Sequence, residues 1–315
     1  MTLQVAVQMD DIASIKIEKD STFALMIEAQ KRGYELFYYQ VQDLSLNEGR
    51  VIARGYPVHV QREKGNHYTL GQERVRDLHE QADIVLIRQD PPFDMSYITA
   101  THILDHLEGD TLVLNNPTEV RNAPEKLLVT HYPDLIPETL ISADRRALTE
   151  FYEAHKDIVL KPLYGNGGEQ IYRIDHLGKN LNPILEMFET FYREPVIAQR
   201  YIPEIKDGDK RIILIDGEPA GAVLRVPQGK EERANFDTGG LGQKTTLTAR
   251  DRDICERLKP VLQERNLVFT GIDIIGDYLT EINVTSPTGL MQINALDDTC
   301  LEAQLWDAYE AKLNG

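Results

Sequence analysis

Three oxygen-bearing side chains interrupt an otherwise apolar stretch in the last fifth of the sequence, GIDIIGDYLTEINVTSPTG at residues 271–289. Asp273, Glu281 and Asn283 stand among isoleucine, leucine and valine residues, the types that strands favour. An unpaired buried carboxylate is costly, so such a group usually has a cationic partner or a metal. Oxygen ligands without His or Cys suit Mg²⁺ or Mn²⁺. The stretch therefore predicts a divalent metal site at these three residues.

The connection between the two expected strands decides whether the three side chains can meet. Glu281 and Asn283 are two residues apart in a strand, so they share one face. A three-residue loop brings Asp273 to that face, whereas a plain two-residue turn at Gly276-Asp277 puts it on the other. We expect an odd-length connection or a bulge. The alternative is a solvated polar face of a sheet.

A glycine-rich segment, YGNGG at 164–168, lies between two expected strands. Glycine lets backbone N–H groups approach a phosphate closely. The segment is no Walker A loop, because the chain has no Gly-Lys-Ser/Thr, and no dinucleotide fingerprint, because Gln170 occupies the third glycine position. Taken alone, a plain hairpin loop is the better interpretation of this segment. Lys161, on the strand that enters the loop, shifts the balance a little toward a nucleotide site, and the alternative for Lys161 is a solvated edge position. The candidates for nucleotide binding are Lys161, Gly165, Gly167 and Gly168.

A long segment, PQGKEERANFDTGGLGQK at 227–244, has no strong helix or strand signal. Loops of this length are usually functional lids or disordered segments. Arg225 precedes the segment and Arg233 lies in its middle. The alternatives are a mobile surface loop and a lid whose arginines close over a reacting anion.

The elements that must position these residues alternate between strand and helix in the first half of the chain. A β-α-β start implies a parallel sheet, and a Pro- and Asn-rich boundary falls near 115–126. The expected strands of this half are 3–9, 34–41, 82–90 and 111–117, and the expected helices are 20–33 and 95–108.

The second half of the chain is expected to be rich in hairpins. Asp216-Gly217 predicts the turn of a hairpin at 210–226, and Thr248 with Asp251 predicts a capping box that begins a helix ending near 265. The other expected strands are 157–163, 170–174 and 195–202.

Length and charge limit the class of protein. A chain of 315 residues exceeds the size of a single core, so two or three units are expected. A formal charge of −17 argues against nucleic acid as a partner. No apolar run reaches the ~18 residues of a membrane span, and residues 1–11 do not read as a signal peptide. Two cysteines, Cys255 and Cys300, cannot form a disulfide framework, which favours the cytoplasm.

Several long stretches resemble one enzyme family. A Lys before a glycine hairpin loop, the strand QRYIP and the late Asp…Glu-x-Asn resemble the ATP-grasp ligases. From end to end the chain is similar to bacterial glutathione synthetases. It departs from their pattern at Asp11, where Pro is usual, and at Met291, where Arg often stands. The matching stretches are KDSTFALMIEAQKRGYEL, IRQDPPFD, IPEIKDGDKRIILIDGEP, RVPQG and GIDIIGDYLTEINVTSPTG.

The resemblance implies the fold and the reaction. The fold would be α/β, with an N-terminal parallel-sheet (Rossmann-like) domain followed by a two-lobed ATP-grasp α+β unit. The domains would span 1–122 on the substrate side, 123–200 as the central lobe, and 201–315 as the C-terminal lobe with the metal site. ATP, γ-glutamylcysteine and glycine would give glutathione, ADP and phosphate through an acyl phosphate. The resemblance also implies a homo-oligomer.

The resemblance assigns a role to each candidate residue. Asp273, Glu281 and Asn283 would hold two Mg²⁺ ions, with Mn²⁺ as the alternative metal. The phosphates of ATP would contact Lys126, Lys161 and the glycine loop. The adenine slot and the ribose would be bound by Gln199, Tyr201, Ile202 and Asp209. The acyl phosphate would be stabilised and shielded by Arg211, Arg225 and Arg233. The dipeptide would contact Arg88, Ser286 and Thr288, although a structural ion pair is an equal alternative for Arg88.

Two other functions stay open from the sequence. One is an ATP-grasp ligase that joins a different acid and amine, against which the stretches DPPFD and NVTSPTG argue. The other is a non-catalytic nucleotide-binding regulator on the same fold. The metal triad and the arginines argue against a regulator, because nucleotide binding alone needs no acyl-phosphate stabilisation.

Overall fold

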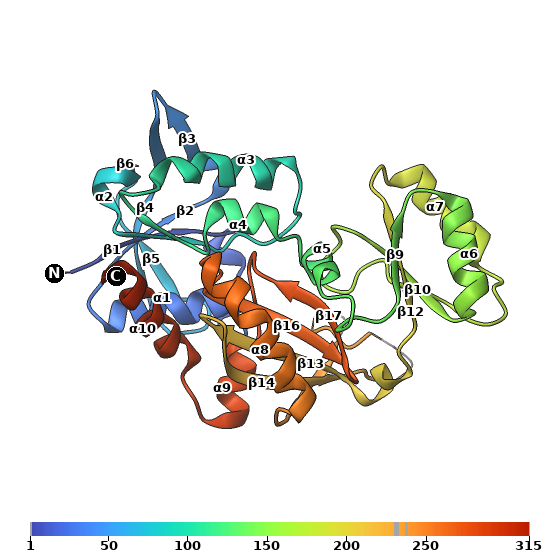
Figure 1. Ribbon diagram of the computed structural model, residues 1–315. Helices are drawn as coiled ribbons and strands as arrows, with labels where there is room; N and C mark the ends of the chain where they lie inside the picture. Colours follow the sequence, from blue (N-terminus) through green and yellow to red (C-terminus); the bar gives the residue numbers. More distant parts are fainter. Residues whose placement is uncertain (1, 230–232, 237–238, 315) are drawn as a thin grey trace.

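The computed structural model describes residues 2–229, 233–236 and 239–314 and contains three sheets in chain order. Figure 1 shows the first sheet in blue and teal and the last in yellow, orange and red. The middle sheet, with β9, β10 and β12, stands to one side with its two helices. The mixed α/β architecture agrees with the expected fold class.

The N-terminal sheet has a parallel centre. β1 (Gln4–Gln8) pairs with β2 (Glu35–Tyr39) and with β7 (Ile84–Ile87), and β7 pairs with β8 (Leu112–Leu114), all in parallel. Helix α1 (Ser21–Lys31) connects β1 to β2, and the Asp20 side chain caps it by accepting from the backbone N–H of Phe23. The predicted β-α-β start is thus confirmed.

An antiparallel extension of this sheet was not expected. It consists of β3 (Leu44–Asn47), β4 (Arg50–Val60), β5 (Tyr68–Leu70) and β6 (Arg74–Asp77). β4 pairs with all three others and with β2. A Cβ at Gly55 would lie 2.2 Å from the Tyr38 carbonyl oxygen, so β4 needs glycine where it crosses β2.

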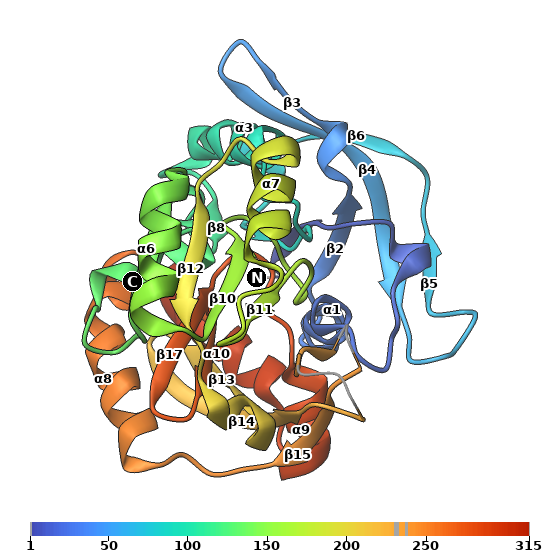
Figure 2. The ribbon, with the colours of Figure 1, turned by 90° about the vertical axis from the view of Figure 1, so that its right-hand side faces the viewer.

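The central lobe is a four-stranded antiparallel sheet in the order β11-β10-β12-β9. Its strands are β9 (Thr139–Ser142), β10 (Ile158–Pro162), β11 (Tyr172–Ile174) and β12 (Val196–Arg200). Helices α6 (Arg145–His155) and α7 (Leu181–Phe191) bury Leu148, Tyr152, Leu185 and Phe188 in the core of the lobe, and Figure 2 shows both in front of it. β10 and β11 pair directly, as the hairpin interpretation required, whereas β9, α6 and α7 were not predicted.

The C-terminal sheet has the order β15-β14-β13-β16-β17. Its strands are β13 (Asp209–Ile215), β14 (Glu218–Val226), β15 (Leu241–Lys244), β16 (Phe269–Ile275) and β17 (Tyr278–Asn283). Asp216 and Gly217 turn with φ of 48° and 81°, which confirms the predicted hairpin. Thr248 and Asp251 form the predicted capping box of α8 (Ala249–Glu264).

The segment 227–244, which has no strong helix or strand signal in its sequence, nevertheless contains a strand at its end. Residues 241–244 form β15, which pairs along the edge of β14. The sequence LGQK has no apolar alternation, so its strand depends on a partner rather than on its own pattern. Residues 230–232 and 237–238 of the expected lid lie outside the described residues.

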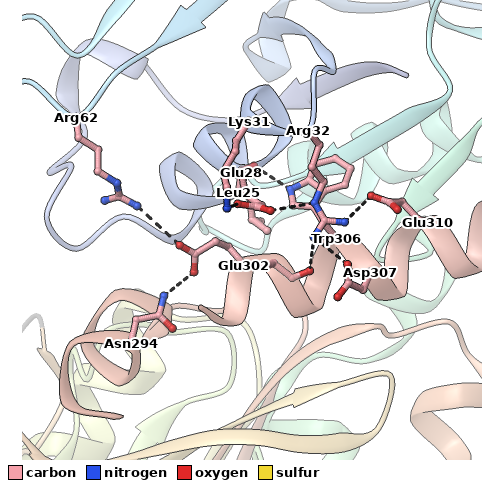
Figure 3. A network of polar contacts seen from close by, with 11 residues as sticks. Leu25, Glu28, Lys31, Arg32, Arg62, Asn294, Glu302, Trp306, Asp307 and Glu310 are labelled. Atoms are coloured by element: carbon pink, nitrogen blue, oxygen red, sulfur yellow. Dashed lines mark hydrogen bonds and ion pairs between the residues drawn. The ribbon is translucent and has the colours of Figure 1, made fainter. Parts of the chain in front are cut away.

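The last helix returns to the N-terminal sheet. α9 (Leu290–Asp297) leads to α10 (Leu301–Asn314), which packs along α1. Arg32 binds Glu28, Asp307 and Glu310 at 3.0, 2.8 and 2.6 Å. Figure 3 shows Arg32 pointing toward these three residues. The Trp306 indole N–H donates to the Leu25 carbonyl at 2.9 Å. The two ends of the chain therefore share one core, in which α1, α10 and β13 all take part.

The remaining elements are short. They are the α-helices α2 (Leu78–Gln81), α3 (Met95–Leu104), α4 (Pro117–Asn122) and α5 (Glu125–Leu128), and 3₁₀ turns at Ile12–Ser14, Val41–Asp43, Asp105–Leu107, Val129–His131 and Pro203–Asp207. None of the helices in the described part of the chain has the length and apolar character that a membrane span needs. We propose that domain boundaries near 122 and 200 follow the division into three sheets.

Asn115 joins the N-terminal sheet to the C-terminal sheet. Its buried side-chain amide donates to the carbonyls of Phe269 and Val284 at 2.7 and 2.8 Å. Its amide oxygen accepts from the Phe269 N–H at 2.9 Å. One side chain thus pairs three backbone groups next to the strands that carry the candidate metal ligands.

We expect Asn115→Ala to lower the free energy of unfolding by about 2–4 kcal/mol, because three buried backbone groups lose their partner. Urea denaturation followed by circular dichroism measures this. The exposed Asn122 is the matched control, and Asn122→Ala should stay within about 0.5 kcal/mol of the parent protein. Equal stability of the two variants would contradict the structural role of Asn115.

Candidate active site

The hairpin of β16 and β17 places the three predicted metal ligands on one face of the sheet. The turn is the two-residue Gly276-Asp277, but the register shifts between Asp273 and Ile274. Asp273 therefore pairs with Glu281, and Gly271 pairs with Asn283. The expected bulge is confirmed, and it reverses the outcome that a plain two-residue turn would give.

The registers of β13 with its two neighbouring strands also bring two pairs of oppositely charged side chains to this face. Arg211 pairs with Asp273 across β13 and β16, and Asp209 pairs with Arg225 across β13 and β14. Arg211 binds the Asp273 carboxylate with Nε and, at 2.8 Å, with Nη2. Arg225 binds Asp209 and also reaches Asp273 at 3.0 Å. We call these four residues the buried charge cluster.

The two carboxylates of the buried charge cluster have opposite pKa shifts. Burial acts to raise the pKa of Asp273, but the guanidinium groups of Arg211 and Arg225 outweigh it and hold this pKa far below its usual range. Burial raises the pKa of Asp209 to about 7, although Arg225 partly opposes it. Asp209 Oδ1 and Arg225 Nε are buried without a hydrogen-bond partner in the described chain. This unused hydrogen-bonding capacity suits a polar ligand.

Two buried lysines approach this face from other parts of the chain. Lys126 on α5 binds Glu125 and the Gly165 carbonyl, and lies 3.5 Å from Glu281. Lys161 on β10 donates to Gln199 at 3.3 Å. Burial, together with the charge of Lys126, lowers the pKa of the Lys161 ammonium. The interpretation of Lys161 as a solvated edge residue is therefore wrong.

A first cavity of about 340 Å³ lies between the central lobe and the C-terminal sheet. Its wall has an apolar part, from Val159, Ile171, Ile202 and Ile205, and a polar part near the buried charge cluster. The Arg173 guanidinium lies over the Tyr201 ring at 3.6 Å. The predicted site residues that line this cavity are Lys161, Gln199, Tyr201, Ile202, Asp209, Arg233, Asp273 and Glu281.

A second cavity of about 240 Å³ adjoins the first, because Lys161 and Glu281 line both. Lys19 and Asp90 bring the N-terminal domain into its wall. The predicted site residues that line the second cavity are Lys126, Lys161, Gly165, Gly167, Gly168, Arg211, Arg225, Glu281, Asn283, Ser286 and Thr288.

Arg88 is the one predicted site residue that lines neither cavity. It is buried, donates to the Thr22 hydroxyl and to the Pro287 carbonyl at 2.9 Å each, and lies over the Phe269 ring. It forms no ion pair with any described residue, so the ion-pair alternative is wrong. Arg88 holds the segment 286–288 against the N-terminal domain.

Arg233 connects the segment after β14 to the glycine loop. Its guanidinium donates to the Gly168 carbonyl at 3.0 Å, and the neighbouring Asn235 lines both cavities. Gly168 has φ of +79°, and a Cβ there would lie 2.5 Å from the Asn235 side chain. Glycine is thus required for this close approach.

Some residues of the site gave no signal in the sequence. Glu125 is half-buried beside Lys126 and Glu281, and desolvation raises its pKa. Lys19, Asp90 and Gln292 line the second cavity. Lys19 and Asp90 belong to stretches that carry the resemblance, KDSTF and IRQDPPFD, but nothing in their own types indicated that they would face one cavity.

The donor set fits a hard divalent cation. Within residues 2–229, 233–236 and 239–314, no group of three or more His, Cys, Asp and Glu residues could hold a metal. The predicted set needs only two carboxylates and the amide oxygen of Asn283. Magnesium prefers few protein ligands and completes its shell with water and phosphate oxygens. Asp273, Glu281 and Asn283 meet this requirement on one face beside the cavities.

The chain matches two family models in succession. The model described as prokaryotic glutathione synthetase, N-terminal domain, matches residues 3–121. The model described as prokaryotic glutathione synthetase, ATP-grasp domain, matches residues 125–298. Together the two models cover most of the chain.

Curated relatives agree with this match. Glutathione synthetase of Brucella melitensis biotype 1 is 53% identical over 312 residues, covering 99% of this chain and 100% of that protein. Glutathione synthetase of Escherichia coli O127:H6 is 44% identical over 313 residues, covering 99% of both.

Two solved structures share the fold at low identity. D-cycloserine synthetase DcsG has a TM-score of 0.67 at 14% identity and covers 98% of this chain and 99% of its own. The ATP-grasp ligase PsnB, with minimal precursor, Mg and ADP, has a TM-score of 0.63 at 16% identity and covers 99% and 98%. With the fold, the two cavities and the full-length matches taken together, the chain belongs to the prokaryotic glutathione synthetase family.

Proposed function

We propose that this chain ligates γ-glutamylcysteine to glycine at the expense of ATP and releases glutathione, ADP and phosphate. The observation that carries the proposal is the pair of adjoining cavities that share Lys161 and Glu281. One has an apolar part that suits a base, and the other gathers lysines, arginines and glycine N–H groups that suit phosphate. The relatives at 53% and 44% identity, which carry the name glutathione synthetase over their full length, support this choice of substrates.

The reaction has two balanced steps. An oxygen of the cysteine carboxylate attacks the γ-phosphorus of ATP, the bond to the β-phosphate oxygen breaks, and ADP leaves. The neutral amine of glycine then attacks the acyl carbon, phosphate leaves with the C–O bonding electrons, and the nitrogen loses a proton. The first step brings two anions together, so it needs cationic side chains in a site that excludes water.

For the nucleotide, we propose that the first cavity takes the adenine and ribose. Gln199, Tyr201 and Ile202 form the base slot, and the unused Oδ1 of Asp209 accepts from a ribose hydroxyl. Lys126 and Lys161 then face the phosphates together with Gly165, Gly167 and Gly168.

For the chemistry, we propose that Asp273, Glu281 and Asn283 hold Mg²⁺, or Mn²⁺ in its place. When bound, the metal neutralises charge on the phosphate oxygens. Arg211 and Arg225 orient and stabilise the transferring group, because both line the second cavity beside these donors. Arg233 lines the first cavity and helps to close it over the nucleotide, because its guanidinium already binds the glycine loop.

We propose that the dipeptide binds to the segment that carries Ser286 and Thr288, because both residues line the second cavity. Direct contact of Arg88 with a dipeptide carboxylate stays a prediction. Its two hydrogen bonds favour a positioning role, in which it fixes Pro287 and the residues on either side. Homo-oligomerisation and a cytoplasmic location also stay proposals, the latter supported by two free cysteines.

The direct test is release of ADP measured with each co-substrate omitted in turn. We expect full turnover only with ATP, γ-glutamylcysteine and glycine together, and glutathione equal to the ADP formed. Turnover with another acid or amine but not with this pair would identify a different ATP-grasp ligase. Nucleotide binding without any turnover would identify a regulator.

The role of Glu281 gives a sharp prediction. We expect Glu281→Gln to reduce ATP turnover by at least about 10²-fold at saturating Mg²⁺, because the change removes one negative charge and keeps the size. The apparent affinity for Mg²⁺ should fall in the same titration. Asp277→Asn removes an exposed carboxylate from the turn of the same hairpin and should leave turnover within about twofold. Near-normal turnover of Glu281→Gln would place the metal site elsewhere.

The role of Arg233 predicts that its loss uncouples ATP consumption from glutathione formation. We expect Arg233→Ala to retain ATP binding but to release more phosphate than glutathione, because the acyl phosphate becomes accessible to water. The ratio of ADP to glutathione measures this and should rise above one. Arg252→Ala, an exposed arginine on α8, is the control and should keep the ratio at one. A ratio of one in both variants would argue against shielding by Arg233.

A further inference from the structure

The γ-glutamyl end of the dipeptide, which lies far from the reacting carboxylate, must also be recognised by the enzyme. The γ-glutamyl group of the dipeptide carries an ammonium and a carboxylate on one carbon, several bonds away from the carboxylate that reacts. An enzyme that selects this dipeptide gains most from a cation and an anion placed at that end, since each forms a charge-assisted hydrogen bond. Such a pair must line the second cavity and must not be neutralised by protein partners.

The charges that line the second cavity fall into two groups. Most are paired within the protein: Lys126 with Glu125 and Glu281, Arg211 with Asp273, and Arg225 with Asp209. Lys161 is bound to Gln199. In the described chain, the side chains of Lys19, Asp90 and Glu169 form no hydrogen bond and no ion pair, and Lys19 and Asp90 do not pair with each other.

The sheet topology explains why Lys19 and Asp90 face one cavity. Asp90 follows the carboxyl end of β7, and Lys19 ends the connection that leaves the carboxyl end of β1. β1 and β7 are adjacent and parallel, and β2 lies on the other side of β1. Connections therefore leave β1 and β7 in opposite directions, which opens the kind of crevice where α/β sheets bind ligands.

The backbone at Asp90 is held in place while its side chain stays free. The Asp90 N–H donates to the Asp10 carboxylate at 2.7 Å, and the Arg88 N–H donates to the Gln8 carbonyl at 2.8 Å. Arg88 in turn donates to the carbonyl of Pro287, which also lines the second cavity. Glu169, by contrast, follows the glycine loop in the central lobe, where the phosphates are proposed to bind.

From these observations, and resting on the proposed function, we propose that Asp90 and Lys19 recognise the γ-glutamyl end of the dipeptide. Asp90 accepts hydrogen bonds from its ammonium, and Lys19 donates to its α-carboxylate. Both are specificity-determining residues that take no part in the transfer of the phosphoryl group. The side chains are exposed, so their substitution should not disturb the fold.

Two analogues of the dipeptide test its ammonium and its α-carboxylate separately. Glutaryl-cysteine lacks the ammonium, and 4-aminobutanoyl-cysteine lacks the α-carboxylate, while both keep the reacting carboxylate. We expect the parent enzyme to prefer the dipeptide over each analogue by about 10- to 100-fold in kcat/KM. Asp90→Asn should abolish only the preference over glutaryl-cysteine, and Lys19→Gln only the preference over 4-aminobutanoyl-cysteine. The KM for ATP should not change in either variant.

Glu169→Gln is the matched control, because it also removes an unpaired carboxylate from the second cavity. It should leave both preferences as in the parent enzyme. Loss of the ammonium preference in Glu169→Gln, or unchanged preferences in the Asp90 and Lys19 variants, would overturn the assignment. Failure of the parent enzyme to ligate γ-glutamylcysteine to glycine would instead overturn the proposed function, so the two failures are distinguishable.

Discussion

The buried charge cluster of Asp209, Arg211, Arg225 and Asp273 is the interaction on which the site depends. Four ionisable groups removed from water are costly unless each faces its opposite charge with good geometry. Here the register of β13 with both neighbouring strands provides the opposite charges. A slip of one residue would turn two of these side chains into the apolar core. The charges therefore tolerate one register only, and the separate register of β16 with β17 brings Glu281 and Asn283 to the same face.

The rest of the site is held by partners from distant parts of the chain. Lys126 comes from the connection after the N-terminal sheet, Lys161 from the central lobe and Glu281 from the C-terminal sheet. Lys126 binds both Glu281 and the carbonyl of Gly165, so it ties the glycine loop to the metal-binding hairpin. Binding of a phosphate must exchange some of these internal contacts for new ones. The cations are thus already positioned before the substrate arrives, as electrostatic catalysis requires.

Local signals in the sequence predicted local structure well. Asp216-Gly217 and the Thr248–Asp251 capping box each need only neighbouring residues, and both were predicted correctly. β5 and β15 were missed because they are only three and four residues long and depend on the edge of an existing strand. α6 was missed although Asp144, which caps it, and its apolar residues Leu148 and Tyr152 were readable signals.

Features that depend on distant partners could not be predicted in the same way. Buried Lys161 has its hydrogen-bond partner, Gln199, 38 positions along the chain, and no pattern around Lys161 indicates it. The carboxylates at 273 and 281 could be predicted as a pair because they lie on one hairpin. Their arginine partners on β13 and β14 were recognised only as functional candidates, since pairing between strands far apart in sequence leaves no local trace.

The packing of α10 on α1 has a consequence for synthesis of the protein on the ribosome. Leu25 and its neighbours emerge early, but the Trp306 side chain that covers them is made 281 residues later. The N-terminal unit must therefore wait with this apolar surface of α1 uncovered while the other two sheets are translated. At the usual rates of elongation this interval lasts about 15–60 s, long enough for chaperones to bind the exposed face. Completion of the first unit of the chain is thus coupled to translation of its last helix.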